Sequence, residues 1–497
     1  MLRIRISFVQ MINFMKRKSF ISAFSLILLM ILMLQTRKKL DVQANSLYLA
    51  QFVSECDQNC LDVEKDLLKL AWKNRLNADM MEKSITNEGD LEIFYKLCKT
   101  IYVEKRTITF GILGGSASRT RENPTYYSTV AVFVEKLFNV NVEIVNRAIG
   151  GMPSVVSAYC LQSMLNVSNI DILLVEFAIN DNVAASDIRG RSIEDLIRHF
   201  NSLPFREQPF IIFANLISTR ILYDPETPNC FNVEEEYFNP VARYYNVAAV
   251  SWKRTICDKT HQNLTGFQPS DLSSSDMNHP SENGHLQLGY MISYLLLKLY
   301  KSYKPAKITS DFKVHDSPYV KNTSSTNVPL DSRVWLAHPA CFIIKHDFEE
   351  RCNNENNNIH ICLEEMRGFE IEKERAKVIL VNKDTRGFLK FHCSIDEDMF
   401  NLQKRLRVGF TFIMDTEILS PKIIQLKIFY KNISYLSENV DLPPHKYHIG
   451  QTFESRPVDL IAREFYVVIQ PVNNKTNAFN LNLLALLVGL EDDIDKN

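Results

Sequence analysis

The sequence lacks several patterns that would assign a function directly. Its 497 residues contain no GxxxxGK[ST] and no GxGxxG motif, which argues against a phosphate loop and a dinucleotide site. No CxxC pair occurs, so a zinc knuckle is not expected. The 57 basic and 58 acidic residues nearly cancel, and without a broad basic face we expect no nucleic-acid partner. What remains is a globular composition, 46% hydrophobic and 23% charged, over a length that suits two or three domains.

One long uncharged run stands near the N-terminus. Residues 19–36 carry no charge and lie between Lys16–Lys18 and Arg37–Lys39, as in a short transmembrane helix. The basic residues before the run predict that residues 1–18 are a cytosolic tail. We therefore expect a transmembrane signal-anchor and a single-pass type II membrane protein of the secretory pathway, with a lumenal or extracellular remainder. Secretion after signal cleavage near Ala44 is the alternative.

All ten cysteines lie beyond this run, and an even number permits disulfides in an oxidising compartment. Cys230 with Cys257, and the trio Cys341, Cys352 and Cys362, stand close enough in sequence to pair locally, although spacing leaves the pairing open. Five sequons for possible N-glycosylation agree with a lumenal address: Asn166, Asn263, Asn322, Asn432 and Asn474.

Four regions beyond residue 45 differ in pattern. Residues 46–105 have apolar positions at helical spacing and predict a helical stem or extension. Residues 106–303 alternate short apolar strands with amphipathic helices, which predicts an α/β domain whose parallel sheet is covered on both faces. The expected strands are 107–113, 142–146, 171–177, 209–215 and 247–251, and the expected helices are 124–138, 153–165, 192–202, 233–245 and 281–303.

The last two regions differ from the α/β region and from each other. Residues 304–340 are rich in proline, serine, threonine and asparagine and predict a linker. Residues 341–490 contain strand patterns without long helices between them, which predicts a smaller, β-sandwich-like accessory domain.

Four short motifs of the α/β region carry groups suited to acyl chemistry. Ser116 follows a strand, and Asp276 and His279 supply the orienter and the base that a serine nucleophile needs. Asn180 and Gly151, each after a strand, offer a side-chain amide and a backbone N–H to a developing oxyanion. Each motif also has a structural interpretation: a helix cap, a surface histidine, a loop asparagine or a turn glycine.

In this order the motifs resemble the blocks of the SGNH hydrolase superfamily, the GDSL-like serine esterases and acylhydrolases. The resemblance covers residues 106–303 and implies a flavodoxin-like, three-layer parallel-sheet domain. Gly115 replaces the aspartate of the usual Gly-Asp-Ser block, and Ala178 replaces the glycine of the usual Gly-x-Asn-Asp block. A Gly-Gly-Ser opening occurs in some branches, and the extra methyl group of Ala178 bears on the fit of a bulky acyl group. Glu176, within a buried strand, needs a partner that the sequence does not identify.

The resemblance implies a Ser-His-Asp mechanism, with Ser116, His279 and Asp276 as nucleophile, base and orienter. It also implies an oxyanion hole formed by Ser116, Gly151 and Asn180, and it implies no metal and no cofactor. The expected activity is hydrolysis of O-acyl esters, and the expected substrate is an acetyl ester on a glycan. A lumenal O-acyltransferase and a non-catalytic glycan-binding protein on a hydrolase scaffold are the alternatives.

Overall fold

The computed structural model describes residues 59–119, 124–165, 169–181, 186–226, 229–302, 334–343, 352, 358–374, 377–382, 387–400, 405–413, 422–442, 450–459, 462–472 and 482–493. The predicted tail 1–18, the predicted anchor 19–36 and three of the sequons lie outside these ranges. Among the helices that the structure describes, none is long and apolar enough to cross a membrane.

The α/β domain contains the predicted parallel sheet, and its strand order is β1-β6-β5-β4-β2-β3. All but β1 run parallel, and β4, β5 and β6 are buried along their whole length, as expected for strands covered on both faces. Numbered in chain order, these five follow the flavodoxin-like order 2-1-3-4-5. They are β2 (Ile108–Gly114), β3 (Val142–Asn146), β4 (Ile172–Glu176), β5 (Phe210–Asn215) and β6 (Ala248–Ser251).

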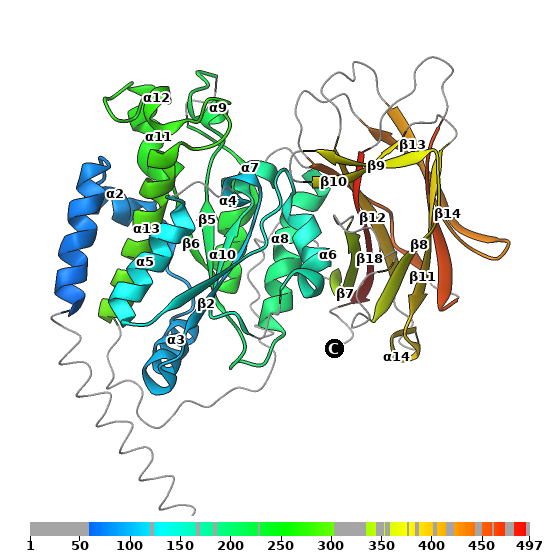
Figure 1. The fold of residues 1–497 in the computed structure, drawn as a ribbon, viewed down its shortest axis with the longest axis horizontal. Coiled ribbons are helices and arrows are strands. Elements are labelled where there is room, and N and C mark those ends of the chain that lie inside the picture. The colour runs from blue at the N-terminus through cyan, green and yellow to red at the C-terminus, as the bar shows by residue number, and fades with distance from the viewer. Residues whose placement is uncertain are drawn as a thin grey trace, which may run out of the picture. The chain divides into compact units, whose positions relative to one another are not determined.

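Helices cover both faces of this sheet (Figure 1). One hydrophobic cluster joins the sheet to α6, α8 and α10, while α5 and α13 pack against each other elsewhere on the domain. The longer helices are α3 (Leu91–Glu104), α5 (Tyr126–Phe138), α6 (Ser154–Met164), α8 (Ser186–Asn201), α10 (Asn239–Tyr245), α11 (Lys253–His261) and α13 (Glu282–Ser302). Shorter elements are α4 (Ser116–Arg119), α7 (Ala178–Asp181), α9 (Thr219–Leu222), the π-helix η2 (Glu234–Phe238) and α12 (Pro269–Leu272).

The extension before the α/β domain is not wholly helical, which corrects the prediction for 46–105. Residues 59–73 and α2 (Ala78–Ser84) are helical, but β1 (Ile85–Asn87) pairs antiparallel with β6 at the edge of the sheet. Side chains fasten this short strand: Thr86 Oγ1 donates to the carbonyl of Ala249 at 3.2 Å, and Asn87 Nδ2 to that of Val247 at 2.7 Å. Three residues are too few to show a strand period in the sequence.

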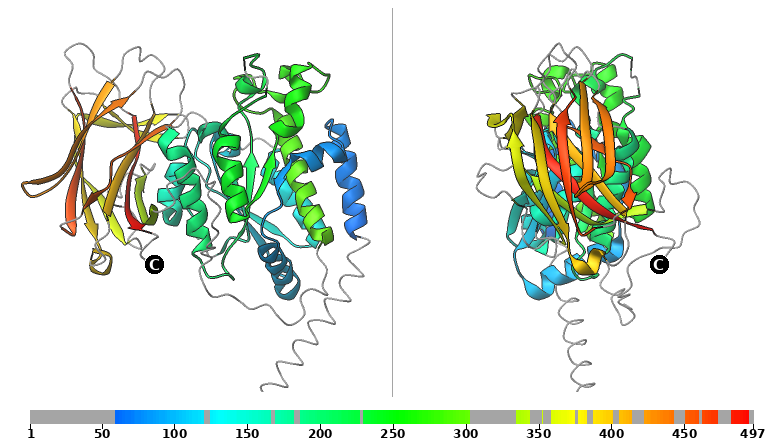
Figure 2. Two further views of the ribbon diagram at one scale, coloured as in Figure 1. Left: turned by 180° about the vertical axis from the view of Figure 1, so that it is seen from behind. Right: turned by 90° about the vertical axis from the view of Figure 1, so that its right-hand side faces the viewer.

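The C-terminal region forms two antiparallel sheets that share one apolar core, so the predicted sandwich is confirmed (Figure 2). One sheet holds β7 (Val334–Ile343), β9 (Phe369–Glu374), β10 (Lys377–Asn382), β12 (Arg405–Ile413), β15 (Gly450–Glu454), β16 (Val458–Asp459) and β18 (Asn482–Asp493). The other holds β8 (Ile359–Arg367), β11 (Phe388–Ile395), β13 (Lys422–Tyr430), β14 (Ile433–Leu442) and β17 (Glu464–Pro471), and the short helix α14 (Glu397–Phe400) follows β11.

Strand β7 begins inside the segment predicted as a linker, so residues 334–340 belong to the sheet instead. Among the described strands of its sheet, β7 pairs only with β18. Pro339 is compatible with such an edge position because its missing N–H interrupts no second ladder. Proline content alone therefore misplaced the start of this domain.

The two domains share a covalent and an apolar contact. Cys160 of α6 is bonded to Cys341 of β7, and Cys341, Ala485 and Leu487 belong to the same buried cluster as α6 and α8. Arg191 of α8 pairs with Glu454, a carboxylate that Arg407 also contacts. Cys341 therefore has a distant partner, whereas Cys352 pairs with Cys362 and Cys230 with Cys257 as local spacing allowed.

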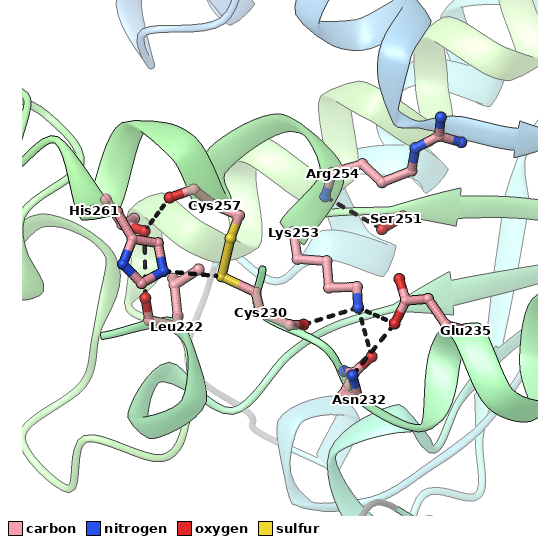
Figure 3. Close-up of a disulfide and its surroundings, with 10 residues drawn as sticks. Leu222, Cys230, Asn232, Glu235, Ser251, Lys253, Arg254, Cys257 and His261 are labelled. Carbon is pink, nitrogen blue, oxygen red and sulfur yellow. Dashed lines mark hydrogen bonds and ion pairs between the residues drawn. A yellow bond between two sulfur atoms is a disulfide. The ribbon is translucent and has the colours of Figure 1, made fainter. Parts of the chain in front are cut away.

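The Cys230–Cys257 disulfide fastens the segment before η2 to α11 (Figure 3). Nearby, the buried Lys253 donates to the Cys230 carbonyl at 2.9 Å and to Asn232 Oδ1 at 2.8 Å, and it pairs with Glu235. The lysine charge is thus matched by a carboxylate and by oriented dipoles, which a buried cation requires.

We expect the Cys160→Ser/Cys341→Ser double variant to lose about 2–5 kcal/mol of unfolding free energy, because this disulfide closes a long loop. Urea unfolding followed by tryptophan fluorescence measures the loss. The control is Cys352→Ser/Cys362→Ser, whose sequence separation is 10 rather than 181 and whose loss should be smaller. An equal or larger loss in the control would contradict the loop-closure account.

Candidate active site

The candidate nucleophile lies where the strand order reverses. β2 stands between β3, which follows it in the chain, and β4, and crevices at such switch points bind ligands in open α/β sheets. β2 ends at Gly114, and Ser116 is the first residue of the short helix α4. Its side chain is half-buried, so the hydroxyl is held by the fold and still open to a substrate.

The structure brings Ser116, His279 and Asp276 together, although Ser116 and His279 are 163 residues apart. Ser116 Oγ lies 2.5 Å from His279 Nε2, and His279 Nδ1 lies 2.5 Å from Asp276 Oδ2. The His279 side chain is 29% exposed and that of Asp276 is 49% exposed, so the site is open to solvent. This is the nucleophile–base–orienter chain that activates a serine.

A locked loop positions Asp276 and His279. An antiparallel bridge joins Ser273 to Pro280, and the Ser274 N–H donates to the His279 carbonyl at 2.9 Å. Within the loop, Asp276 Oδ1 accepts the backbone N–H of Asn278 at 2.8 Å and that of His279 at 3.0 Å. The aspartate therefore shapes the turn that presents its own histidine.

The loop is also fastened to the segment that follows β5. Ser218 Oγ donates to Asn278 Oδ1 at 2.7 Å, and Thr219 Oγ1 and Ser273 Oγ lie 2.6 Å apart. These contacts could not be predicted, because Ser218 and Thr219 stand in no sequence motif. They hold the base in place from a second element of the sheet edge.

Asp276 stays ionised in this loop. Burial alone would raise its pKa, but hydrogen bonds from Ser274 Oγ, from the N–H groups of His279 and Asn278, and from the His279 ring hold the pKa well below its usual range. An ionised carboxylate only accepts hydrogen bonds, so Nδ1 of His279 carries a proton. The Nε2 atom of neutral His279 is then free to accept the Ser116 hydroxyl proton.

Asn180 lies against the nucleophile turn. It follows β4 in α7, is 2% exposed, and its Oδ1 accepts no hydrogen bond in the described part of the chain. A Cβ atom on Gly115 would fall 1.9 Å from that oxygen. The close approach of the Asn180 amide therefore requires a glycine at position 115, where the usual block has aspartate. The oxygen of this amide makes no hydrogen bond to the loop backbone in the described part of the chain.

Gly151 lies in a buried loop held against the end of β2. Its φ of 74° is in the left-handed region, which suits glycine. The N–H of Ile149 donates to the Gly114 carbonyl at 3.0 Å, and Asn146 Nδ2 donates to the Ser118 carbonyl at 2.8 Å. The loop is thus fixed beside the nucleophile turn, and a donor role for the Gly151 N–H stays a prediction.

The partner that Glu176 needs is Ser118, whose Oγ donates to Glu176 Oε2 at 3.0 Å. Ser118 Oγ also lies 2.7 Å from Tyr126 OH, and the Tyr126 ring stacks on His285 with centroids 6.1 Å apart. His285 is buried, and burial together with the neighbouring His279 lowers its pKa to about 4. The sequence indicated that Glu176 needs a partner, but it indicated neither Ser118 nor the contact of Ser118 with Tyr126.

One group of potential metal ligands occurs in the described part of the chain, namely Cys230, Cys257 and His261. Both sulfur atoms are bonded to each other, and His261 Nε2 lies 3.4 Å from Cys230 Sγ (Figure 3). In this disulfide form the thiolates that a metal needs are not available.

Comparison with known proteins reveals a shared fold. No protein-family model matches the chain, and no curated protein matches it either. The crystal structure of CEX, a two-domain esterase active on acetylated mannans, matches with 14% identity and a TM-score of 0.54, over 82% of this chain and 98% of its own. A second CEX structure matches with 15% identity and a TM-score of 0.54, over 83% and 99%. The two chains share a fold over both domains.

The acetylxylan esterase Axe2 from Geobacillus stearothermophilus also matches, with 16% identity and a TM-score of 0.31. The match covers 38% of this chain and 94% of Axe2.

We expect a fluorophosphonate probe to label Ser116, because the hydrogen bond to His279 activates this hydroxyl. His279→Ala should abolish the labelling, which peptide mass spectrometry locates. His261→Ala is the matched control, since His261 lies beside a disulfide and has no contact with Ser116. Labelling that persists in His279→Ala, or that occurs at another serine, would contradict the assignment.

Proposed function

We propose that the protein is a serine esterase that hydrolyses O-acyl esters. The observation that carries the proposal is the continuous hydrogen-bond chain Ser116–His279–Asp276, with 2.5 Å at each link. It lies at the carboxyl edge of the sheet, where a substrate can reach it. An SGNH-type mechanism accounts for this arrangement, and the shared fold with a two-domain esterase supports it.

In the first step Ser116 Oγ attacks the ester carbonyl carbon, and its proton passes to His279 Nε2. The imidazolium formed is stabilised by the ionised Asp276 across the Nδ1–H bond. His279 then returns the proton to the leaving alcohol oxygen, and the ester bond breaks. Water attacks the acyl-serine by the same route, with His279 as base, and the carboxylic acid leaves.

The negative oxygen of each tetrahedral intermediate needs hydrogen-bond donors. The N–H of Ser116, the N–H of Gly151 and the amide of Asn180 are the donors we propose. The packing of Asn180 on Gly115 and the anchoring of the Gly151 loop to Gly114 support this set. Because these donors are held before substrate arrives, they need little reorganisation in the transition state.

We further propose an acetyl ester on a glycan as the substrate class. The support is the fold shared with CEX, which is active on acetylated mannans and matches through both domains. We also propose that the protein resides in the secretory pathway and that residues 19–36 anchor it in the membrane. Three disulfides support an oxidising compartment, and the sequons Asn263 and Asn432 are exposed.

We expect residues 41–497, made in a secretory host, to release acetate from acetylated oligosaccharides and from a small acetyl ester. Ser116→Ala should abolish the release, and quantifying free acetate against transfer to an added sugar separates hydrolase from acyltransferase. If wild type and Ser116→Ala are equally inactive on esters of all acyl lengths and on acetylated sugars, the esterase proposal is wrong. A non-catalytic glycan-binding protein would then be the better interpretation.

We expect Asn180→Ala to lower kcat by about 100- to 1,000-fold with a smaller change in KM, as loss of one oxyanion donor does. Gly115→Ala should act in the same direction, because its methyl group would displace the Asn180 amide. Steady-state kinetics on the small ester measures both. Asn215→Ala is the matched control, a buried asparagine at the end of β5, and its kcat should stay near wild type. An Asn180→Ala enzyme as fast as this control would exclude the donor role.

A further inference from the structure

Behind the nucleophile turn lies a carboxyl group that the proposed mechanism does not use. Glu176 is the last residue of β4, is fully buried, and makes no ion pair in the described part of the chain. Its Oε1 has no hydrogen-bond partner there. An ionised carboxylate in this position would be costly, because neither a cation nor a full set of donors compensates its charge.

The contacts of this carboxyl group converge on the helix that bears the nucleophile. Glu176 Oε2 is bound to Ser118 Oγ at 3.0 Å, and Ser118 belongs to the same four-residue helix as Ser116. Ser118 Oγ continues to Tyr126 OH at 2.7 Å, and the carbonyl of Glu176 accepts the N–H of Gly115 at 3.1 Å. Both the side chain and the backbone of Glu176 therefore hold the turn on either side of Ser116.

We propose that Glu176 is a positioning residue, an uncharged buried carboxyl group that fixes Ser116 through Ser118 and Gly115. The inference rests on the proposed function and adds a residue to it. In the neutral form Glu176 Oε2 accepts the Ser118 hydroxyl proton and Ser118 Oγ accepts that of Tyr126, so that the turn is held without a buried charge. Ionisation places an uncompensated charge beneath the turn, which loosens the Ser116–His279 alignment.

The surroundings of Glu176 favour the neutral form of its carboxyl group. The titratable groups that face Glu176 are Asp181 of α7, whose charge disfavours a second negative charge, and Tyr126 of α5. Burial raises the pKa of Glu176 to about 8, against the hydrogen bonds from Ser118 and the Gly115 N–H. The uncharged state therefore dominates at neutral pH.

The test compares the pH dependence of kcat in wild type, Glu176→Gln and Glu176→Met. Wild-type kcat should fall on the alkaline side as the carboxyl group ionises, and Glu176→Gln, which keeps a neutral hydrogen-bonding group, should match wild type at neutral pH and lose that alkaline fall. Glu176→Met should lower kcat about tenfold or more with little change in KM, as expected for a misaligned nucleophile. Glu234→Gln is the matched control, another fully buried glutamate with a pKa raised to about 7 by burial, and it should keep the wild-type profile.

A stability measurement separates this inference from the proposed function. Because folding raises the pKa of Glu176 from 4.5 to about 8, its stabilising contribution is complete below 4.5 and is lost as pH rises to about 8. The stability of Glu176→Gln relative to wild type should therefore increase over that window. A flat difference, an alkaline fall that survives in Glu176→Gln, or wild-type kcat in Glu176→Met would each overturn the proposal. If no ester is cleaved by wild type, the rate of probe labelling at Ser116 replaces kcat in the same comparison.

Discussion

The hydrogen bond between Ser116 Oγ and His279 Nε2 joins an early and a late part of the α/β domain. One end is set by β2, which lies next to the edge strand β3, and the other by a loop that leads into α13. A 2.5 Å contact between groups 163 residues apart tolerates little displacement, since a misplacement of about 1 Å can cost two orders of magnitude in rate. The bridge between Ser273 and Pro280, the Asp276 turn and the anchors at Ser218 and Thr219 all restrict the loop that holds the base. Much of the local structure at the sheet edge is explained by this requirement.

The sequence predicted the elements that depend on their own residues and missed those that depend on distant partners. The five parallel strands were predicted because each is a short, mostly apolar run between amphipathic helices. Burial accounts for that pattern in β2, β4, β5 and β6, whereas the edge strand β3 is partly exposed. β1 was missed because three residues show no period, and what fixes them is pairing with β6. The first part of β7 was predicted to be linker because it belongs to the proline-containing segment 304–340. An edge strand nevertheless accommodates Pro339. The Cys160–Cys341 bond joins residues 181 apart in sequence, and no spacing rule encodes it.

The candidate site divides in the same way. Ser116, Asp276 and His279 could be predicted because the chemistry demands those residue types and the Asp-x-x-His spacing is local. Gly115 looked like a departure from the Gly-Asp-Ser block that the sequence resembles, and only the packing of the Asn180 amide gives its reason. Glu176 was identified as a buried carboxylate in need of a partner, but Ser118 reads in sequence as an ordinary helix serine. Its role becomes visible only when β4, α4 and α5 are placed together.

The accessory β-domain braces the side of the site where the oxyanion donors are proposed. α6 begins at Ser154, just after Gly151, and carries Cys160, which is bonded to Cys341 of β7. At the start of α6 the N–H of Ser154 donates to Asp181 Oδ1 at 2.8 Å, one residue beyond Asn180. Cys341, Ala485 and Leu487 of the β-domain belong to the same buried cluster as α6, and α6 directly follows the Gly151 loop and is bound to α7 through Asp181. Donors that stabilise a transition state act best when their positions are fixed beforehand. These contacts join the β-domain to the part of the α/β domain that carries the proposed oxyanion donors, which is a physical reason for the two domains to pack together.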